Sequence, residues 1–185
     1  MRRFQPLQLV AYSDADWARN SDDWTSISAY VIFFGSNPIS WCSRKQRIVA
    51  RSSTKAEYRY VTSIATELTW IQNLLTELGV ALPVAPRLLC DNIGATYFCA
   101  NPVFHSLMKH LALDYHFVRE KVQTGSLHVA HVSTDNQLAD ILTKPLAKSR
   151  FTFFRSKIGI SDGSTVLRGH NRKLSQTDSS GAVTS

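Results

Sequence analysis

The sequence predicts an α/β domain whose central sheet is mixed, with an antiparallel part and a parallel part. Three predicted strands follow one another near the start of the chain, and two later strands alternate with helices. Hydrophobic residues make up 44% of the 185 residues and charged residues 19%, which is typical of a globular protein with a buried core.

Short apolar runs bounded by turn residues predict the strands. The second run is rich in β-branched and aromatic residues, and Gly35-Ser36-Asn37 behind it signals a turn. The predicted strands cover residues 7–13, 27–34, 38–43, 88–90 and 127–132. A basic loop over residues 44–47 follows the third strand.

A long amphipathic helix is predicted over residues 55–78, because apolar residues recur there at steps of three and four. Its apolar stripe consists of Val61, Ile64, Leu68, Ile71, Leu75 and Leu78. Gly79 marks a suitable end for this helix. The same reasoning predicts shorter helices over residues 93–100, 109–123, 137–143 and 149–158.

The composition divides the chain into one domain, residues 1–160, and a tail, residues 161–185. The tail is rich in Ser, Thr, Gly and Asn and poor in apolar residues, so we expect it to be disordered or non-native.

The balance of charge indicates the kind of partner. Lys and Arg number 21 against 14 acidic residues, which gives a net charge of +7. Such an excess favours a polyanion through attraction to phosphates.

The cysteines and the apolar runs indicate the compartment. The three cysteines, Cys42, Cys90 and Cys99, form no C-x-x-C pair, which argues against a zinc site or a disulfide framework and fits a reducing compartment. The first residues lack the apolar run of a signal peptide, and no run reaches the ~18 residues of a membrane span. We therefore expect a soluble intracellular protein that is not secreted.

Four acidic residues stand out because each lies in or beside an apolar segment: Asp14, Glu57, Asp91 and Asp140. A two-metal phosphodiesterase needs carboxylates that converge on a pair of cations, and Mg²⁺ prefers such oxygen ligands. Asp91 directly follows a predicted strand, at the kind of strand end where ligands collect in open α/β sheets.

Each of these acids also has a structural interpretation. Asp14 could lie in a solvated turn, and Asp16, which has the same strand parity, is a rival ligand. The run from Thr54 to Glu57 fits a capping box. Asp91 fits a helix N-cap, and Asp140 fits a solvated position near a helix N-terminus.

Seven runs, in order, resemble the ribonuclease H domain of copia-type long-terminal-repeat retrotransposons. They extend over about residues 7–146 and lie at 12–18, 37–41, 52–58, 90–92, 101–105, 114–120 and 137–146. The resemblance implies the ribonuclease H fold, a five-stranded mixed sheet flanked by helices.

The resemblance also implies the site. The family's Asp-Glu-Asp-Asp set falls on Asp14, Glu57, Asp91 and Asp140, which would bind two Mg²⁺ ions, with Mn²⁺ as a substitute. His131 resembles the histidine that assists proton transfer or product release, and a plain strand-end histidine is the alternative. The family's helical segment carries His105, His110 and His116, which we expect to face substrate or to be structural rather than to bind metal.

The implied activity is hydrolysis of the RNA strand of RNA–DNA hybrids during reverse transcription. The implied partner is the reverse transcriptase domain of the same polyprotein, in a cytoplasmic virus-like particle or the nucleus, with no membrane and no small-molecule cofactor. We expect Asn92 and the loop at Ser52 and Ser53 to contact the 2′-hydroxyls of the RNA. Candidates for contacts to the nucleic-acid backbone are Lys45, Arg47, Lys109 and Arg119.

Departures from the family pattern leave alternatives open. Leu107 and Met108 stand where the family has Arg and Thr, Arg19 where it has Gly, and Ser133 where it has Pro. The first alternative is a catalytically decayed module that binds nucleic acid or the polymerase. The second is a DNA nuclease of the same fold, such as an integrase or resolvase.

Overall fold

A computed structural model describes residues 7–18, 24–46, 49–100 and 112–160, with the side chains of 112–115 excepted. The predicted tail, residues 161–185, lies outside the described residues, as do Arg47, His105, Lys109 and His110.

The sheet has five strands in the order β3-β2-β1-β4-β5. They are β1 (Leu9–Asp16), β2 (Ile27–Phe34), β3 (Asn37–Lys45), β4 (Arg87–Cys90) and β5 (His128–His131). The pairs β1–β2 and β2–β3 are antiparallel, whereas β1–β4 and β4–β5 are parallel. The predicted mixed sheet is thereby confirmed.

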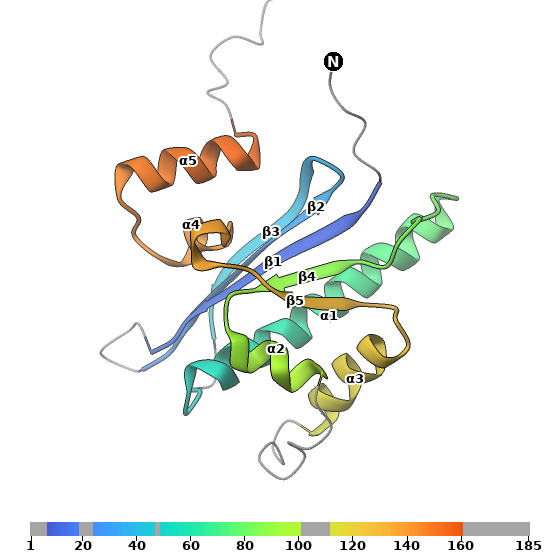
Figure 1. Ribbon diagram of the computed structural model, residues 1–185, viewed down its shortest axis with the longest axis horizontal. Coiled ribbons are helices and arrows are strands. Elements are labelled where there is room, and N and C mark those ends of the chain that lie inside the picture. Colours follow the sequence, from blue (N-terminus) through green and yellow to red (C-terminus); the bar gives the residue numbers. More distant parts are fainter. Residues whose placement is uncertain (1–6, 19–23, 47–48, 101–111, 161–185) are drawn as a thin grey trace, which may run out of the picture.

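Helices cover both faces of this sheet (Figure 1). They are α1 (Ser53–Glu77), α2 (Ile93–Ala100), α3 (Ala112–Gln123), the 3₁₀ turn η2 (Thr134–Asn136), α4 (Asp140–Thr143) and α5 (Lys148–Ile158). One face carries α1, α2 and α3, and the other carries α4 and α5. Among the described residues, no helix is both long enough and apolar enough to cross a membrane.

Two apolar clusters hold the layers together. On one face Val61, Ile64 and Leu68 of α1 pack in a fully buried cluster with residues of β1, β2 and β4. On the other face Phe33 of β2 packs with Phe154 of α5. Each large side chain contributes about 1.5–3 kcal/mol when it leaves water. The predicted helical stripe is confirmed along most of its length, although its last member, Leu78, is 67% exposed.

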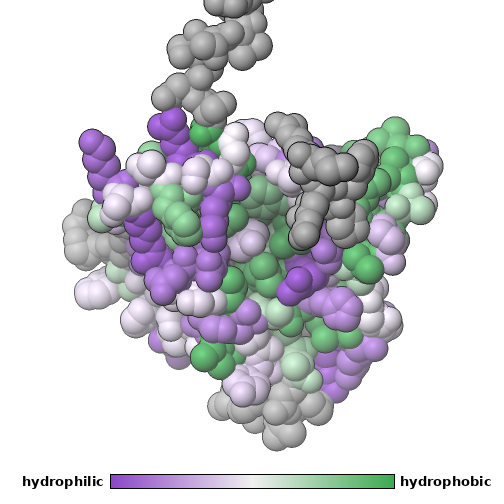
Figure 2. Space-filling view, turned by 45° about the horizontal axis from the view of Figure 1, so that its top comes forward, coloured by the Kyte–Doolittle hydropathy of each residue, from purple (hydrophilic) through white to green (hydrophobic). Residues whose placement is uncertain are grey.

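The helix α5 is basic. This helix contributes four cationic residues and no acidic ones: Lys148, Arg150, Arg155 and Lys157. Figure 2 shows hydrophilic side chains gathered on the left of the surface, where α5 lies. A dense positive charge on one helix raises the local attraction for anions.

Several predicted element boundaries differ from the structure. The predicted helix over residues 137–143 contains only Asp140–Thr143, because Gln137 takes an extended backbone and its Nε2 donates to the Ser13 carbonyl at 2.7 Å. The first and third strands run further than predicted, to Asp16 and Lys45, since pairing with β2 continues that far.

Candidate active site

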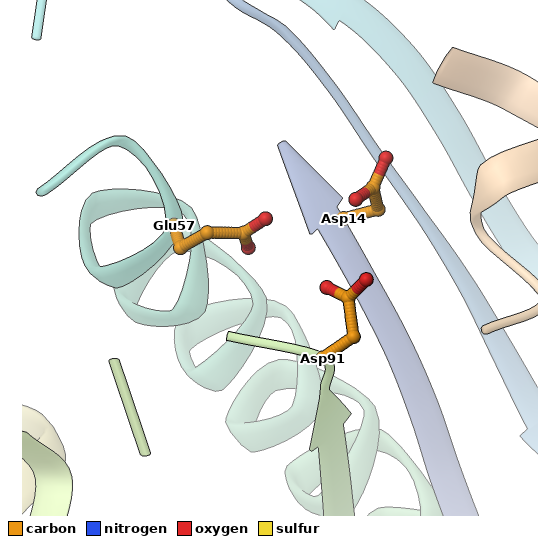
Figure 3. A group of neighbouring side chains, drawn as sticks. All are labelled: Asp14, Glu57 and Asp91. Carbon is orange, nitrogen blue, oxygen red and sulfur yellow. The ribbon is translucent and has the colours of Figure 1, made fainter. Parts of the chain in front are cut away.

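Three carboxylates from distant parts of the chain converge at one end of the sheet. Asp14 comes from β1, Glu57 from α1 and Asp91 from the residue that follows β4. Each offers one oxygen, and these oxygens all lie within 4.8 Å of one another. Figure 3 shows the three side chains pointing toward a common space.

The sheet topology explains why Asp14 and Asp91 meet. β1 and β4 are adjacent and parallel, and Ser13 pairs with Cys90. The residue after Ser13 is Asp14 and the residue after Cys90 is Asp91, so both aspartates lie at the carboxyl end of their strands, at the same edge of the sheet. Ligand sites of open α/β folds form at such an end.

Glu57 enters the group from α1, and its position excludes the capping-box interpretation. The N-cap of α1 is Ser52, whose side chain accepts from the Lys55 amide. Glu57 is only 3% exposed, and its Oε1 accepts from the Ala15 amide at 2.7 Å. Burial, and next the negative charge of Asp14, raise the pKa of Glu57 well above its usual value. A carboxylate in this position gains from a cation nearby.

Asp91 does not serve as the helix cap either. The neighbouring Asn92 takes that role, since its Oδ1 accepts from the Ala95 amide at 2.9 Å. Asp91 is half-buried, and its Oδ2 accepts from the hydroxyl of Thr134 at 3.2 Å. Its carboxylate is therefore oriented toward the other acids.

Asp14 lies deep in the site, with 1% of its surface exposed. The Thr143 hydroxyl donates to its Oδ2, and the Lys144 ammonium lies 3.1 Å from its Oδ1. Burial raises the pKa of Asp14, and these two contacts offset part of the rise. Asp16, the rival ligand, does not belong to the cluster of three acids found among the described residues.

Asp140 is buried, so the interpretation as a solvated helix position is wrong. It begins α4, is 1% exposed, and pairs with Lys144 at 3.0 Å and with Arg150 at 3.1 Å. Burial, followed by the charge of Asp14, raises the pKa of Asp140 to about 6. Lys144 bridges Asp140 and Asp14, which places the fourth acid beside Asp14.

The remaining predicted residues lie around this centre. His131 is exposed at the end of β5, opposite Cys90 in the pairing of β4 with β5. Ser53 is exposed at the start of α1. Lys45 is exposed at the end of β3, beside a cavity of about 550 Å³. Their roles stay predictions.

Thr143, Lys144 and Arg150 contact the acids, but sequence reasoning gave them no role. Lys144 follows Asp140 by four residues, which is the spacing of an ion pair on a helix and is a usable signal. Arg150 comes from the next helix and reaches back ten positions to Asp140, which no local pattern reveals.

The donor set fits a hard divalent cation. All the groups that converge are carboxylates, and Mg²⁺ and Mn²⁺ favour oxygen ligands. Asp14 and Glu57, both nearly fully buried, would repel each other without positive charge between them.

Comparison with known proteins gives close relatives. No family model matches the chain. It is 56% identical over 161 residues to the retrovirus-related Pol polyprotein from transposon RE1 of Arabidopsis thaliana, and 58% identical over 160 residues to that from transposon RE2 of the same plant. These matches cover 87% and 86% of this chain but only 11% of each relative's length.

Comparison with solved structures supports the fold. LC11-RNase H1, isolated from compost, gives a TM-score of 0.55 at 17% identity, over 74% of this chain and 93% of that one. The foamy viral protease-reverse transcriptase gives 0.53 at 14% identity, over 77% of this chain and 96% of the other. The chain therefore corresponds to a segment of retrovirus-related Pol polyproteins from transposons, and it has the fold of solved ribonuclease H domains.

Proposed function

We propose that the chain is a metal-dependent ribonuclease H that hydrolyses the RNA strand of RNA–DNA hybrids. The observation that carries this proposal is the convergence of Asp14, Glu57 and Asp91, with Asp140 linked to Asp14 through Lys144. The relationship to Pol polyproteins supports a role in reverse transcription, next to the reverse transcriptase domain of the same polyprotein. That would take place in a cytoplasmic virus-like particle or in the nucleus.

Two divalent cations, Mg²⁺ or Mn²⁺ in its place, suit this site. Asp14, Glu57 and Asp91 would hold one, and Asp14 and Asp140 the other. When bound, such ions supply an activated water and stabilise the charge that develops on the departing oxygen. Thr143 and the Ala15 amide fix the carboxylates of Asp14 and Glu57 in place.

The surroundings of the acids suit a nucleic-acid substrate. LC11-RNase H1 has been solved in complex with an RNA/DNA hybrid, and the foamy viral enzyme in complex with dsDNA. The Asn92 oxygen is used as a helix cap, so its amide nitrogen is the group we assign to a 2′-hydroxyl contact, together with Ser53. For phosphates we propose Lys45, Arg47, Lys109 and Arg119.

His131 is proposed to assist proton transfer or product release. It lies on β5, beside the strand that leads to Asp91. Imidazole is the side chain that most often serves as a general acid or base in catalysis. We expect products with 5′-phosphate and 3′-hydroxyl ends.

The test is cleavage of a hybrid whose RNA strand carries a 5′ label, in Mg²⁺ and then in EDTA. Asp14→Asn and Asp91→Asn should abolish cleavage and keep hybrid binding, because each removes a charge but keeps the side-chain shape. Asp16→Asn is the matched control on the same strand, and its cleavage rate should stay close to wild type.

Each other outcome identifies an alternative. Hybrid binding without metal-dependent cleavage would indicate the decayed binding module. Cleavage of duplex DNA with no cleavage of the hybrid would indicate the DNA nuclease. Turnover retained in Asp14→Asn would show that the proposed site is wrong.

A further inference from the structure

The ammonium of Lys144 lies between two buried carboxylates. Its Nζ is 3.1 Å from Asp14 Oδ1 and 3.0 Å from Asp140 Oδ1. Both aspartate side chains are 2% exposed, whereas the lysine side chain is 30% exposed. The lysine side chain is thus partly exposed, although its ammonium pairs with two buried carboxylates.

The backbone holds Lys144 at this position. It is the residue directly after α4, and its amide donates to the Asp140 carbonyl at 3.0 Å. The preceding Thr143 is anchored on Asp14. A lysine side chain that starts from this fixed point reaches both carboxylates without further support.

The four acids therefore form two unequal positions for a cation. Among the described residues, the group whose oxygens lie within 4.8 Å of one another contains Asp14, Glu57 and Asp91 but not Asp140. Instead, Asp140 Oδ1 accepts a hydrogen bond from Lys144, and Asp140 Oδ2 accepts one from Arg150. The position between Asp14 and Asp140 is filled by a positive charge that belongs to the chain itself.

An ammonium and a divalent ion cannot share that position. Both would contact the same carboxylate oxygens, and like charges a few ångströms apart repel strongly where water is scarce. A lysine side chain carries its positive charge at neutral pH, and here that charge lies within hydrogen-bonding distance of both carboxylates.

We propose that Lys144 is a built-in competitor of the second divalent cation. Its ammonium keeps Asp14 and Asp140 together in the metal-free chain, and it has to move toward solvent before a divalent cation binds between them. This inference rests on the proposed function. It implies that the two cations bind with unequal affinity and that Lys144 sets the metal concentration at which the site fills.

The test is a titration of the intact chain with Mn²⁺, followed by calorimetry and by the electron paramagnetic resonance signal of free Mn²⁺. Wild type should bind Mn²⁺ in one tighter and one weaker step. In Lys144→Met, whose side chain is unbranched but neutral, the weaker step should tighten by about tenfold or more. In EDTA the same variant should melt at a lower temperature than wild type, because the two carboxylates then face each other without the ammonium.

Two control variants accompany the Mn²⁺ titration of Lys144→Met. Lys148→Met removes a charge from an exposed lysine four residues further on and should leave both Mn²⁺ steps as in wild type. Lys144→Arg keeps the charge and should keep the weak second step. Should the Met variant fail to fold, Lys144→Gln serves in its place, with the same expected tightening.

The outcomes separate this inference from the proposed function. Identical Mn²⁺ binding by wild type and Lys144→Met would refute the role of Lys144 alone. Absence of Mn²⁺ binding by both would refute the metal-dependent function as well. A tighter second step in Lys144→Met, but not in Lys148→Met, would support the competitor role.

Discussion

Replacement of Glu57 by Gln should stabilise the metal-free protein. One oxygen of Glu57 lies within 4.8 Å of oxygens of Asp14 and of Asp91. At an effective dielectric constant of about 20, each such pair of charges repels by about 3 kcal/mol. Lys144 beside Asp14 and the half-exposed position of Asp91 offset much of this sum. We therefore expect Glu57→Gln to raise the free energy of unfolding by about 2 kcal/mol.

The structure supports this substitution because the amide keeps the main contact of the side chain. The Gln oxygen can still accept from the Ala15 amide, which donates to Glu57 Oε1 at 2.7 Å. What the substitution removes is a buried negative charge. The same change should abolish metal-dependent cleavage of the hybrid, since that charge is a proposed cation ligand.

The assay is urea denaturation in EDTA at about pH 8 and again at about pH 4. The gain in the free energy of unfolding should be present at the higher pH and vanish at the lower one. At the lower pH, Glu57 of the wild type is protonated in the folded state, because its pKa is raised, and it then carries no charge that the substitution could remove. Glu77→Gln, an exposed position on the same helix, should change stability by no more than about 0.5 kcal/mol. A Glu57→Gln protein less stable than wild type at pH 8 would refute this reasoning.

Two further predictions concern Asp140. Arg150→Gln should lower the free energy of unfolding by about 2 kcal/mol, because Asp140 Oδ2 loses a charged donor at 3.1 Å. An unchanged midpoint of urea denaturation would contradict this prediction. The metal-free protein should also lose stability as pH rises from about 4 to about 7. The pKa of Asp140 rises on folding to about 6, so the folded state binds that proton more tightly, and the loss from this group alone between these pH values is about 2 kcal/mol. Urea denaturation of wild type and Asp140→Asn at a series of pH values measures this loss. If the free energy of unfolding falls equally steeply with pH in both proteins, Asp140 is excluded as the source.

Local patterns were sufficient where local contacts decide the structure. The strand Ile27–Phe34 and the helix Ile93–Ala100 have the predicted bounds, since turn residues and apolar composition delimit them. The long helix followed from its apolar stripe, and Glu57 stood in line with that stripe, which made its burial predictable.

Long-range contacts account for what the sequence could not reveal. β3 runs to Lys45 because that residue pairs with Ile27 of β2. The helix expected over residues 137–143 is interrupted because Gln137 bonds to the Ser13 carbonyl, 124 positions away. Arg150 reaches Asp140 from another helix. Each of these depends on a partner that only the folded chain brings near.

The helix α5 limits how far the domain can be trimmed. Phe154 packs in the apolar cluster against the sheet, and Arg150, one turn earlier on the same face of the helix, reaches Asp140. A protein truncated before Lys148 would therefore expose apolar side chains of the sheet to water and leave Asp140 without its Arg150 partner. Removal of α5 should abolish the proposed cleavage even though no proposed metal ligand is lost, so truncations that keep the activity should end beyond Ile158.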